Sequence, residues 1–522
     1  TLVAALDAAG LADDLEAVGT TSTRALLVGT DGEVIAGHAT EYALSTPRPN
    51  WAEQDPEHWW TAACESTRAA LAKAGFDGAE VTGIGLSGQM HGSVFLDEAD
   101  EVIRPAILWC DQRTALQCEA ITETVGEDDV IVETLNPVLT GFTAPKIVWL
   151  RDEEPDNYAR VRRVLLPKDY VRLRLTGEYA TEVSDASGTS LLNVPERRWS
   201  DVMLDRLEIP RDWMPRVYES PEVTGTLTAE AAGLTGLAVG TPVVGGGGDQ
   251  AAGAVGNGIV RTGVVSVTTG TSGVVFAHLD EPRMDEQLRT HTFCHAVPGK
   301  WHVMGVMLSA GGSLRWMRDE LCADEIAVAT SMGVDPYALM TEEAAQAPVG
   351  SEGLVFLPYL TGERTPYPNP NARGVFFGLS LRHGRPQMIR AVLEGVAYGL
   401  QDSLQIIEAM GVDITEVRAS GGGARSDLWR QIQTDVTGYP HSVINVDEGP
   451  AYGVALLAGV GTGAFDSVEQ ACASTIRMID TPEADPQAHR LYTKYYRLYQ
   501  DLYRQLEGPF DIAANLVEET GG

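Results

Sequence analysis

Lysine is scarce in this sequence and occurs at only five positions, Lys73, Lys146, Lys168, Lys300 and Lys494. Lysine and arginine together number 38 against 73 acidic residues, which gives a formal net charge of -35. Because nucleic acids and anionic lipids are bound by basic surfaces, this balance argues against both classes of partner. A small anion remains possible, since backbone N–H groups and a metal ion can hold it locally. Salt adaptation and a GC-rich genome that favours arginine codons explain an acidic chain with so little lysine equally well.

Signals for disulfides and for membrane insertion are also missing. The six cysteines form no Cys-x-x-Cys pair and no close framework, which is typical of reduced thiols in a cytosol. We find no charged start followed by an apolar core, and no uninterrupted apolar stretch of the roughly 18 residues that would cross a membrane. We therefore expect a cytoplasmic protein with no membrane partner.

The 522 residues exceed what one hydrophobic core can organise, so the length predicts two or three domains. Residues 23–28 and 34–39 read as two strands joined by an Asp31-Gly32 turn, which indicates a β-hairpin. A helix is predicted over 56–74, with Pro56 near its start, and a buried strand over 82–87. Strands and helices alternate from there, which is typical of the α/β class.

The second half of the sequence begins again near residue 241. A predicted strand at 241–244 runs into four glycines and Asp249, and a strand at 263–268 turns at 269–273. That turn resembles residues 19–23, which indicates a duplicated domain, with residues 1–240 as the first copy and 241–522 as the second. Long helices are predicted over 386–410 and over 486–506.

Four glycine-rich turns follow predicted strands, at 19–21, 269–273, 310–313 and 420–426. Glycine lets the backbone approach a ligand, and successive N–H groups then form a nest for an anion. Threonine and serine hydroxyls in these turns add further donors. Together the four turns favour phosphate or nucleotide binding, although each one alone could simply connect strands. The GxxxxGK[ST] motif of the P-loop is absent.

Two strand ends carry side chains suited to chemistry. Asp249 follows the four glycines, so it is either a base that accepts a proton in a cleft or the N-cap of the helix that begins near Ala251. The turn Gln89-Met90-His91-Gly92 suits a hydroxyl-rich ligand, or else contains only a buried histidine. The histidines between 291 and 302 invite a metal site, but we interpret this stretch as a structural hairpin.

Two long motifs, at 141–153 and 374–394, resemble the FGGY carbohydrate kinases, and the resemblance covers nearly all of the chain from Gly19 onward. It implies two ribonuclease-H-like domains of the actin/hexokinase type, with sugar and ATP bound in a central cleft. The first domain would bind the sugar, and the second would bind ATP and carry the catalytic aspartate. The motifs at 89–92, 109–113 and 166–170 are most similar to those of the kinases of D-xylulose.

The resemblance also implies roles for single residues. Asp249 would be the general base and would contact the sugar and Mg²⁺, while Gln89, Met90 and His91 would contact the sugar. The expected ATP-binding residues all belong to the glycine-rich turns: Thr20, Thr21, Gly270, Thr271, Ser272, Gly312, Gly422, Gly423 and Ser426. A kinase for another sugar or polyol, or a sensor that has lost catalysis, remains an alternative. A homodimer is left open.

The N-terminus departs from the family pattern, in which the first strand ends in Asp-x-Gly-Thr and its aspartate helps to hold Mg²⁺. Direct registry with Gly19-Thr20 places Ala17 where that aspartate should stand. Residues 2–7 look more like the family's strand, so we predict that Asp7 supplies the carboxylate and that extra residues separate it from Gly19.

Overall fold

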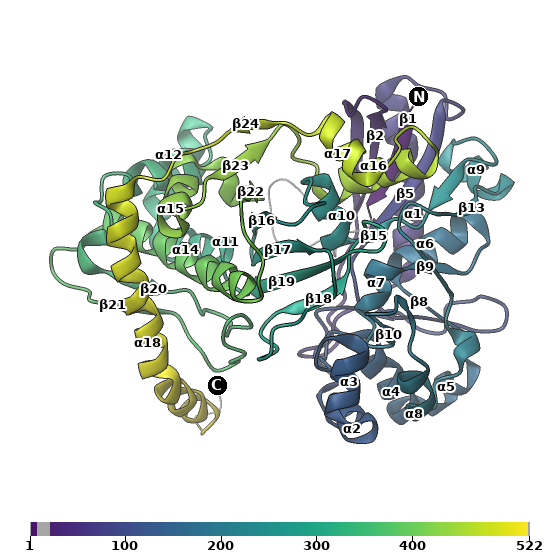
Figure 1. The fold of residues 1–522 in the computed structure, drawn as a ribbon, viewed down its shortest axis with the longest axis horizontal. Helices are drawn as coiled ribbons and strands as arrows, with labels where there is room; N and C mark the ends of the chain where they lie inside the picture. The colour runs from purple at the N-terminus through teal and green to yellow at the C-terminus, as the bar shows by residue number, and fades with distance from the viewer. Residues whose placement is uncertain (1, 8–20, 520–522) are drawn as a thin grey trace.

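The computed structural model describes residues 2–7 and 21–519, and for residues 2–7 it describes the backbone alone. Two lobes lie side by side along the long axis of the molecule, each built around a mixed β-sheet (Figure 1). The α/β class predicted from the sequence is therefore confirmed. We call the part around the earlier sheet the first lobe and the part around the later sheet the second lobe.

The first sheet has the order β13-β14-β5-β1-β2-β3, with β15 paired to β5. Its described strands are β1 (Leu2–Asp7), β2 (Ser22–Gly29), β3 (Val34–Glu41), β5 (Val81–Gly88), β13 (Val223–Thr226), β14 (Pro242–Val244) and β15 (Gly247–Gly248). The second sheet has the order β18-β19-β17-β16-β22-β23-β24. Its described strands are β16 (Val264–Thr269), β17 (Gly273–Leu279), β18 (His291–Cys294), β19 (Trp301–Met307), β22 (Glu416–Ser420), β23 (His441–Ile444) and β24 (Met478–Asp480).

The two sheets follow one plan. In the first, β3, β2 and β1 are antiparallel, β1, β5 and β14 are parallel, and β13 closes the edge antiparallel. In the second, β19, β17 and β16 are antiparallel, β16, β22 and β23 are parallel, and β24 closes the edge antiparallel. This strand-for-strand match confirms the predicted duplication, and the turn at 269–273 corresponds to the connection between β1 and β2.

Helices and small sheets fill the rest of both lobes. The first part of the chain contains the helices α1 (Pro56–Ala74), α2 (Ala115–Val125), α3 (Glu127–Thr134), α4 (Thr143–Glu153), α5 (Pro155–Arg160), α6 (Pro167–Thr176), α7 (Val183–Ser187), α8 (Asp201–Arg206), η1 (Arg211–Trp213), α9 (Ala229–Thr235) and α10 (Asp249–Gly256). The later part contains α11 (Gly311–Leu321), α12 (Ala323–Met332), α13 (Pro336–Ala344), η2 (Ser351–Gly353), α14 (Arg385–Ala409), η3 (Gly422–Arg425), α15 (Asp427–Thr437), α16 (Gly449–Gly461), α17 (Val468–Thr475) and α18 (Pro486–Glu519). The two-stranded sheets are β4 (Glu53–Gln54) with β7 (Ala106–Ile107), β6 (Val94–Leu96) with β8 (Arg163–Leu165), β9 (Ala180–Glu182) with β12 (Arg216–Tyr218), β10 (Leu192–Asn193) with β11 (Arg198–Trp199), and β20 (Val355–Leu357) with β21 (Val375–Phe377).

Helix α1 shows how local sequence sets an element. Asp55 accepts a hydrogen bond from the Glu57 N–H at 3.0 Å, Pro56 occupies the first turn, and Gly75 ends the helix at φ 72°. Its apolar face buries Trp59 and Trp60 against the first sheet. The predicted helix over 386–410 is also present as α14, whereas α18 runs beyond the predicted end at residue 506.

Helices α16 and α17 return to the first lobe although they come late in the chain (Figure 1). A Cβ atom on Gly85 of β5 would lie 2.0 Å from the Val454 carbonyl oxygen of α16, so the helix packs directly on that strand. The Tyr452 hydroxyl also donates to the Gly32 carbonyl oxygen at 3.0 Å. β24 then lies in the second sheet again, so the chain passes between the lobes near 257–263, 445–448 and 476–477.

The predicted boundary between residues 240 and 241 cuts the first sheet, because β14 and β15 follow residue 240 and pair with β13 and β5. We propose moving the boundary to the segment 257–263, after α10. The sequence signal was the restart of the strand pattern near 241, which reflects the last strands of the first sheet and not the beginning of the second.

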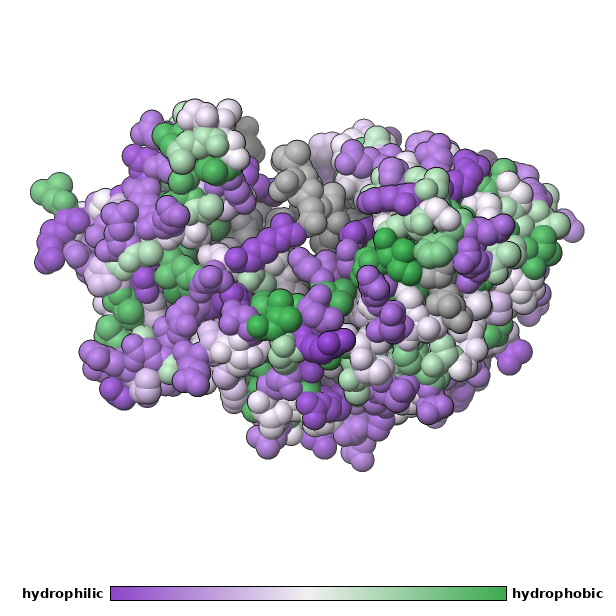
Figure 2. Space-filling model, turned by 90° about the horizontal axis from the view of Figure 1, so that it is seen from above, coloured by the Kyte–Doolittle hydropathy of each residue, from purple (hydrophilic) through white to green (hydrophobic). Residues whose placement is uncertain are grey.

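The surface agrees with the acidic composition. The face in Figure 2 is mostly hydrophilic, and its apolar side chains form small separate groups. Among the described helices, none combines the length and the apolar character that crossing a membrane requires. All six cysteines are free thiols, as predicted.

Candidate active site

Three neighbouring strands of the first sheet end at one edge. β1 and β15 both run parallel to β5, and the register pairs Asp7 with Ser87 and Gly247 with Ser87. Asp7, the turn after Gly88 and Asp249 therefore follow strands that end side by side. Because adjacent strands lie about 4.8 Å apart, Asp7 and Asp249 flank the turn at roughly 10 Å from each other along the sheet. Residues 2–7 form a strand, as predicted.

The sugar-binding turn predicted at 89–92 packs against Gly248, the residue before Asp249. A Cβ atom on Gly248 would lie 2.9 Å from Met90 Cγ and 3.1 Å from Met90 Sδ. A Cβ atom on Gly188 would lie 2.4 Å from His91 Nδ1 and 3.1 Å from Met90 Cε. Glycine at 188 and 248 is thus what allows these two side chains to lie next to the aspartate.

Asp249 is the first residue of α10, and Gly248 is the N-cap. The interpretation of Asp249 as the N-cap is therefore wrong, because the helix begins at Asp249 itself, one residue earlier than that role requires. The half-buried Asp249 carboxylate accepts a hydrogen bond from the Gln250 N–H at 2.8 Å. At a helix start the aligned peptide dipoles stabilise its negative charge, which a proton acceptor needs.

The ring of His91 has a defined tautomer. Nδ1 lies 2.7 Å from the Gly188 carbonyl oxygen, which can only accept, so Nδ1 carries the proton and Nε2 is left as an acceptor. Burial lowers the pKa of His91 to about 3, so the ring is neutral near pH 7. It stacks on Phe142 with 4.6 Å between ring centroids, and its backbone φ of 68° turns it away from the strand.

Lys146 fixes the backbone of the turn at 89–92. Its Nζ donates to the His91 carbonyl oxygen at 2.8 Å and to the Gly141 carbonyl oxygen at 2.7 Å. Thr143 Oγ1 donates to the same His91 oxygen at 3.0 Å. Burial lowers the pKa of Lys146 to about 7. The motif at 141–153, which contains Thr143 and Lys146, therefore fixes the backbone of the predicted sugar turn.

Gln89 lies deeper than the other predicted sugar residues. It is 2% exposed, and its Nε2 donates to Gln54 Oε1 at 3.3 Å inside the first lobe. The same Gln54 oxygen accepts a hydrogen bond from Trp59 Nε1 at 3.0 Å. The contact of Gln89 with a sugar stays a prediction, and its observed contacts are structural.

Behind Asp249 lies a group of fully buried charges, which we call the buried ion cluster: Lys168, Asp169, Arg172, Glu182 and Asp185. Lys168 Nζ lies 2.8 Å from Asp169, 3.1 Å from Asp185 and 3.4 Å from Glu182. Burial raises the pKa of Asp185 well above its ordinary value. Burial by itself would lower the pKa of Lys168, but its three carboxylate neighbours raise it.

The buried ion cluster fixes the backbone of the segment that precedes Asp249. Arg172 donates to the carbonyl oxygens of Val244 and Gly245, each at 2.6 Å. The Gly248 N–H donates to Ser184 Oγ at 3.1 Å, and Glu182 accepts from the first N–H groups of α7. Sequence reasoning missed this cluster, because its members are spread over α6, β9 and α7, and only the run 168–170 hinted at it.

Three of the four predicted glycine-rich turns meet at the end of the second sheet. The Gly311 N–H donates to the Gly270 carbonyl oxygen at 2.7 Å, and the Gly312 N–H donates to that of Thr271 at 3.0 Å. A Cβ atom on Gly311 would lie 2.5 Å from the Gly270 oxygen, and one on Gly423 would lie 2.6 Å from Thr269 Cγ2. These glycines are required for the turns to touch.

The hydroxyls predicted to bind ATP differ in their surroundings. Thr271 and Ser272 are half-buried at the turn, and Gly422 faces open space, with no atom within 4 Å of an added Cβ. Ser426 instead caps α15, since its Oγ accepts a hydrogen bond from the Trp429 N–H at 3.2 Å.

The fourth turn lies at the start of β2. The half-buried Thr21 directly precedes β2, beside the end of the antiparallel β1, whereas Gly19, Thr20 and Ala17 lie outside the described residues. Thr21 therefore lies at the sheet edge at which β1, β5 and β15 end.

Arg364 of the second lobe was not predicted. It is exposed, and its positive charge is among the causes that lower the pKa of His91 and of His291, after burial. Its neighbour Glu363 is buried and accepts hydrogen bonds from the N–H groups of Leu308 at 2.9 Å and Arg364 at 2.7 Å. The second lobe thus brings a cation close to the turn at 89–92.

Metal binding was tested against the described side chains. They include no cluster of three or more histidine, cysteine, aspartate or glutamate residues that could hold an ion. The histidines at 291–302 lie in the β18–β19 hairpin, as predicted. Mg²⁺ needs only one or two carboxylates when phosphate oxygens complete its shell, and the strand ends at Asp7 and Asp249 fit that arrangement.

The comparison with known proteins decides the family. Residues 17–256 match the FGGY family of carbohydrate kinases, N-terminal domain, and residues 265–462 match the C-terminal domain of the same family. The chain belongs to the FGGY carbohydrate kinases. The interval between the two matches coincides with the first passage between the lobes, which supports the boundary that we propose.

Individual FGGY kinases resemble this chain over almost their whole length. A xylulose kinase of Escherichia coli is 41% identical over 94% of this chain and 98% of its own length. The crystal structure of xylulose kinase from Rhodospirillum rubrum has a TM-score of 0.88 at 30% identity and covers 98% of this chain and 100% of that one. A gluconokinase of Bacillus subtilis is 34% identical over 95% of this chain and 96% of its own length. Sugar kinases of the FGGY family use ATP, which agrees with the glycine-rich turns.

Proposed function

We propose that this FGGY kinase transfers the γ-phosphoryl group of ATP to the C5 hydroxyl of D-xylulose. The proposal is carried by one observation: a neutral His91 with an acceptor at Nε2 packs, with Met90, beside Asp249 at the end of β5. A sugar hydroxyl can donate to that Nε2, while a second hydroxyl meets the carboxylate. The substrate name comes from the xylulose kinases that this chain resembles most closely in sequence among those described above.

In this proposal Asp249 is the general base. The C5 oxygen forms a bond to the γ-phosphorus, the bond from that phosphorus to the β,γ-bridging oxygen of ATP breaks, and the hydroxyl proton passes to the Asp249 carboxylate. The buried ion cluster would keep the carboxylate in place through Val244, Gly245 and Gly248. Such positioning matters because displacements of about 1 Å can cost roughly a hundredfold in rate.

The second lobe would bind ATP through backbone N–H groups and the hydroxyls of Thr271 and Ser272. Mg²⁺, held by Asp249 and the carboxylate of Asp7 together with the phosphates, would offset the negative charge. The positive charge of Mg²⁺ is important because the chain itself has a net charge of -35. Closure of the lobes would exclude water, which otherwise competes with the sugar for the phosphoryl group.

The test is ADP release from Mg-ATP over D-xylulose, D-ribulose, L-ribulose, gluconate and glycerol, in low and in molar salt. We expect the highest kcat/KM on D-xylulose. A preference for gluconate would favour the second candidate, for which the relative from Bacillus subtilis is the specific observation. Folded protein that binds ATP but turns over no sugar in either salt would contradict the kinase proposal and favour a sensor.

A further inference from the structure

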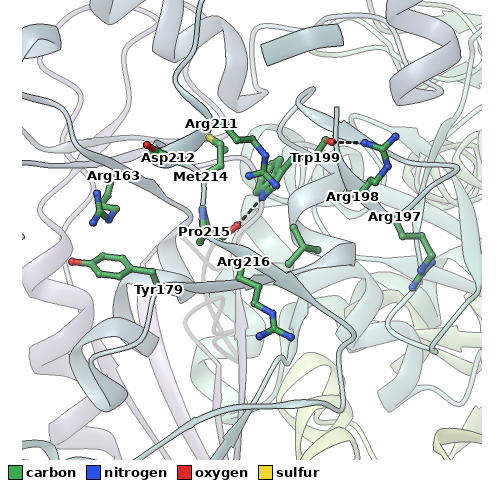
Figure 3. Close-up of a pocket in the computed structure, with 11 residues that line it drawn as sticks. Arg163, Tyr179, Arg197, Arg198, Trp199, Arg211, Asp212, Met214, Pro215 and Arg216 are labelled. Atoms are coloured by element: carbon green, nitrogen blue, oxygen red, sulfur yellow. Dashed lines mark hydrogen bonds between the residues drawn. The ribbon is translucent and has the colours of Figure 1, made fainter. Parts of the chain in front are cut away.

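An open pocket lies in the first lobe and is lined by five arginines, Arg163, Arg197, Arg198, Arg211 and Arg216. They come from β8, the β10–β11 turn, β11, η1 and β12, and Figure 3 shows their side chains placed around the pocket. The cavity volume of about 840 Å³ is within the range of small-molecule sites. In a chain with 73 acidic residues and only 38 basic ones, such a concentration of arginine is unexpected.

Two of the five arginines are already engaged. Arg197 binds both carboxylate oxygens of Glu219, at 2.8 and 2.7 Å, and donates to the Lys300 carbonyl oxygen at 2.5 Å. Arg198 pairs with Glu196 at 2.5 Å and with Asp201 at 3.3 Å. These two form the wall of the pocket, and their charge is balanced by neighbours.

In the described part of the chain, no ion pair neutralises the charges of the other three arginines. In the described part of the chain, Arg163, Arg211 and Arg216 form no ion pair with a carboxylate, although Asp212 also lines the pocket. Arg163 lies over the Tyr179 ring at 4.7 Å, and Arg216 lies over the Tyr218 ring at 4.5 Å, so both guanidinium groups are oriented. Arg211 and Arg216 are exposed to solvent and can therefore reach a ligand.

The chemistry of this set favours a phosphate group. A guanidinium is planar, always charged, and donates two parallel hydrogen bonds to phosphate oxygens, and a phosphate can accept from several directions at once. The cavity is far larger than a bare phosphate ion needs, since the share of one water in liquid volume is about 30 Å³. Tyr179 and Met214 line it beside the arginines and can pack against an organic part.

Strand β12, whose Arg216 and Val217 line the pocket, is connected to the candidate active site. β12 pairs with β9 so that Arg216 lies opposite Ala180 and Tyr218 lies opposite Glu182, a member of the buried ion cluster. Ser220 Oγ donates to that Glu182 carboxylate at 3.1 Å, and the Ser220 carbonyl oxygen accepts from the Gly246 N–H at 2.8 Å. A shift of β12 is therefore passed to the segment that ends in Asp249.

We propose that the arginine pocket is a second anion site, which binds a small phosphate ester and by its occupancy alters the sugar side of the kinase. The site is separate from the one proposed for ATP and sugar, and its binding does not depend on which sugar is phosphorylated. A volume of about 840 Å³ favours a small molecule over an acidic protein segment.

The test is calorimetric titration at low ionic strength with glucose 6-phosphate and, in a second arm, with inorganic phosphate. Excess ADP keeps the nucleotide site filled. We expect one saturable site for the ester, weakened at least about tenfold in R211Q/R216Q, because two charge-assisted contacts are lost. The control R497Q removes an exposed arginine on α18 and should leave the affinity unchanged.

The arms separate the outcomes. Equal affinity for the ester and for inorganic phosphate would assign the site to the free ion and overturn the ester. Absence of saturable binding, or equal binding by R211Q/R216Q, would overturn the site itself. In steady-state assays the ester should change the KM for the sugar in the unmodified protein and not in the double variant, and an unchanged KM would overturn the coupling to the active site.

Discussion

The two sides of the candidate active site are built from the same sheet plan but by different means. On the sugar side, Met90, His91 and Asp249 are held by buried side chains and by five buried charges. On the nucleotide side, N–H groups of the turn at 310–313 donate to carbonyl oxygens of the turn at 269–273, and Gly423 lets the turn at 421–425 pack on Thr269. Buried side chains thus fix the geometry of the sugar side. On the nucleotide side, glycines, which have no side chain, allow the turns to approach one another closely. The following predictions test this contrast.

The largest effect is expected from D249N. An amide cannot accept the hydroxyl proton, so kcat should fall about a hundredfold to ten-thousandfold. The measurement is ADP release at saturating sugar and ATP, with thermal unfolding as the check on folding. Turnover close to that of the unmodified protein would remove Asp249 from the role of base.

Removal of the central cation of the buried ion cluster should mainly reduce stability. K168M leaves three buried carboxylates around an apolar side chain, which we expect to lower the free energy of unfolding by about 3–5 kcal/mol. The measurement is urea unfolding, and K494M on the exposed face of α18 is the matched control. If K168M and K494M unfold at the same urea concentration, the sugar side does not depend on its buried charges.

The nucleotide side should respond to added side chains and not to charge. G311A would bring a Cβ atom to 2.5 Å from the Gly270 carbonyl oxygen, so we expect the KM for ATP to rise about tenfold, in line with the cost of overpacking. G233A on α9 meets no atom within 4 Å and lies outside the predicted site, so it should leave both KM values unchanged. Equal KM values for ATP in the two variants would contradict the idea that turn contacts shape this side.

Acid should weaken the region in which the turn at 89–92 of the first lobe faces the β18–β19 hairpin of the second lobe. Burial lowers the pKa of His91, His291 and His302 to about 3, whereas a histidine in the unfolded chain titrates near 6.5. Between those values the unfolded chain binds more protons, so stability is present above about pH 6.5 and is lost as the pH falls toward 3. In H302F the ring stacked on Phe276 no longer titrates.

We therefore expect H302F to gain about 1–2 kcal/mol of stability relative to the unmodified protein at pH 5, and less at pH 8. The measurement is chemical unfolding at both pH values, and the exposed His58, changed to Phe, is the control. A gain that is the same at pH 5 and pH 8 would assign the effect to packing and not to titration.

Local signals in the sequence predicted much of the fold. The Asp31-Gly32 turn, Pro56 at a helix start and the strand before Gly88 depend on a few adjacent residues, and each was located correctly. The end of α18 depends on which distant surface covers the helix, and it was misplaced. The domain boundary, which we propose to move, depends on the same kind of contact. Packing against another part of the chain, and not propensity, decides such limits.

The same distinction applies to the candidate site. Met90, His91 and Asp249 could be expected together because parallel strands that end at one edge bring their following residues into contact. The buried ion cluster and Arg364 could not be expected, since their neighbours are separated by many residues and come from other elements. Ser426 is a further case, because its hydroxyl also caps its own helix, and its role in ATP binding stays a prediction.

The three passages of the chain between the lobes lie next to one another. A Cβ atom on Gly256 would lie 2.1 Å from the Gly449 carbonyl oxygen, and one on Gly258 would lie 3.2 Å from Ile476 Cδ1. The chain therefore crosses between the lobes at one place, and the β18–β19 hairpin adds a second connection, in which the Cys294 N–H donates to Ser187 Oγ at 3.0 Å. A single cut of the chain cannot separate the two lobes, because α16, which belongs to the first lobe, comes from the far end of the chain.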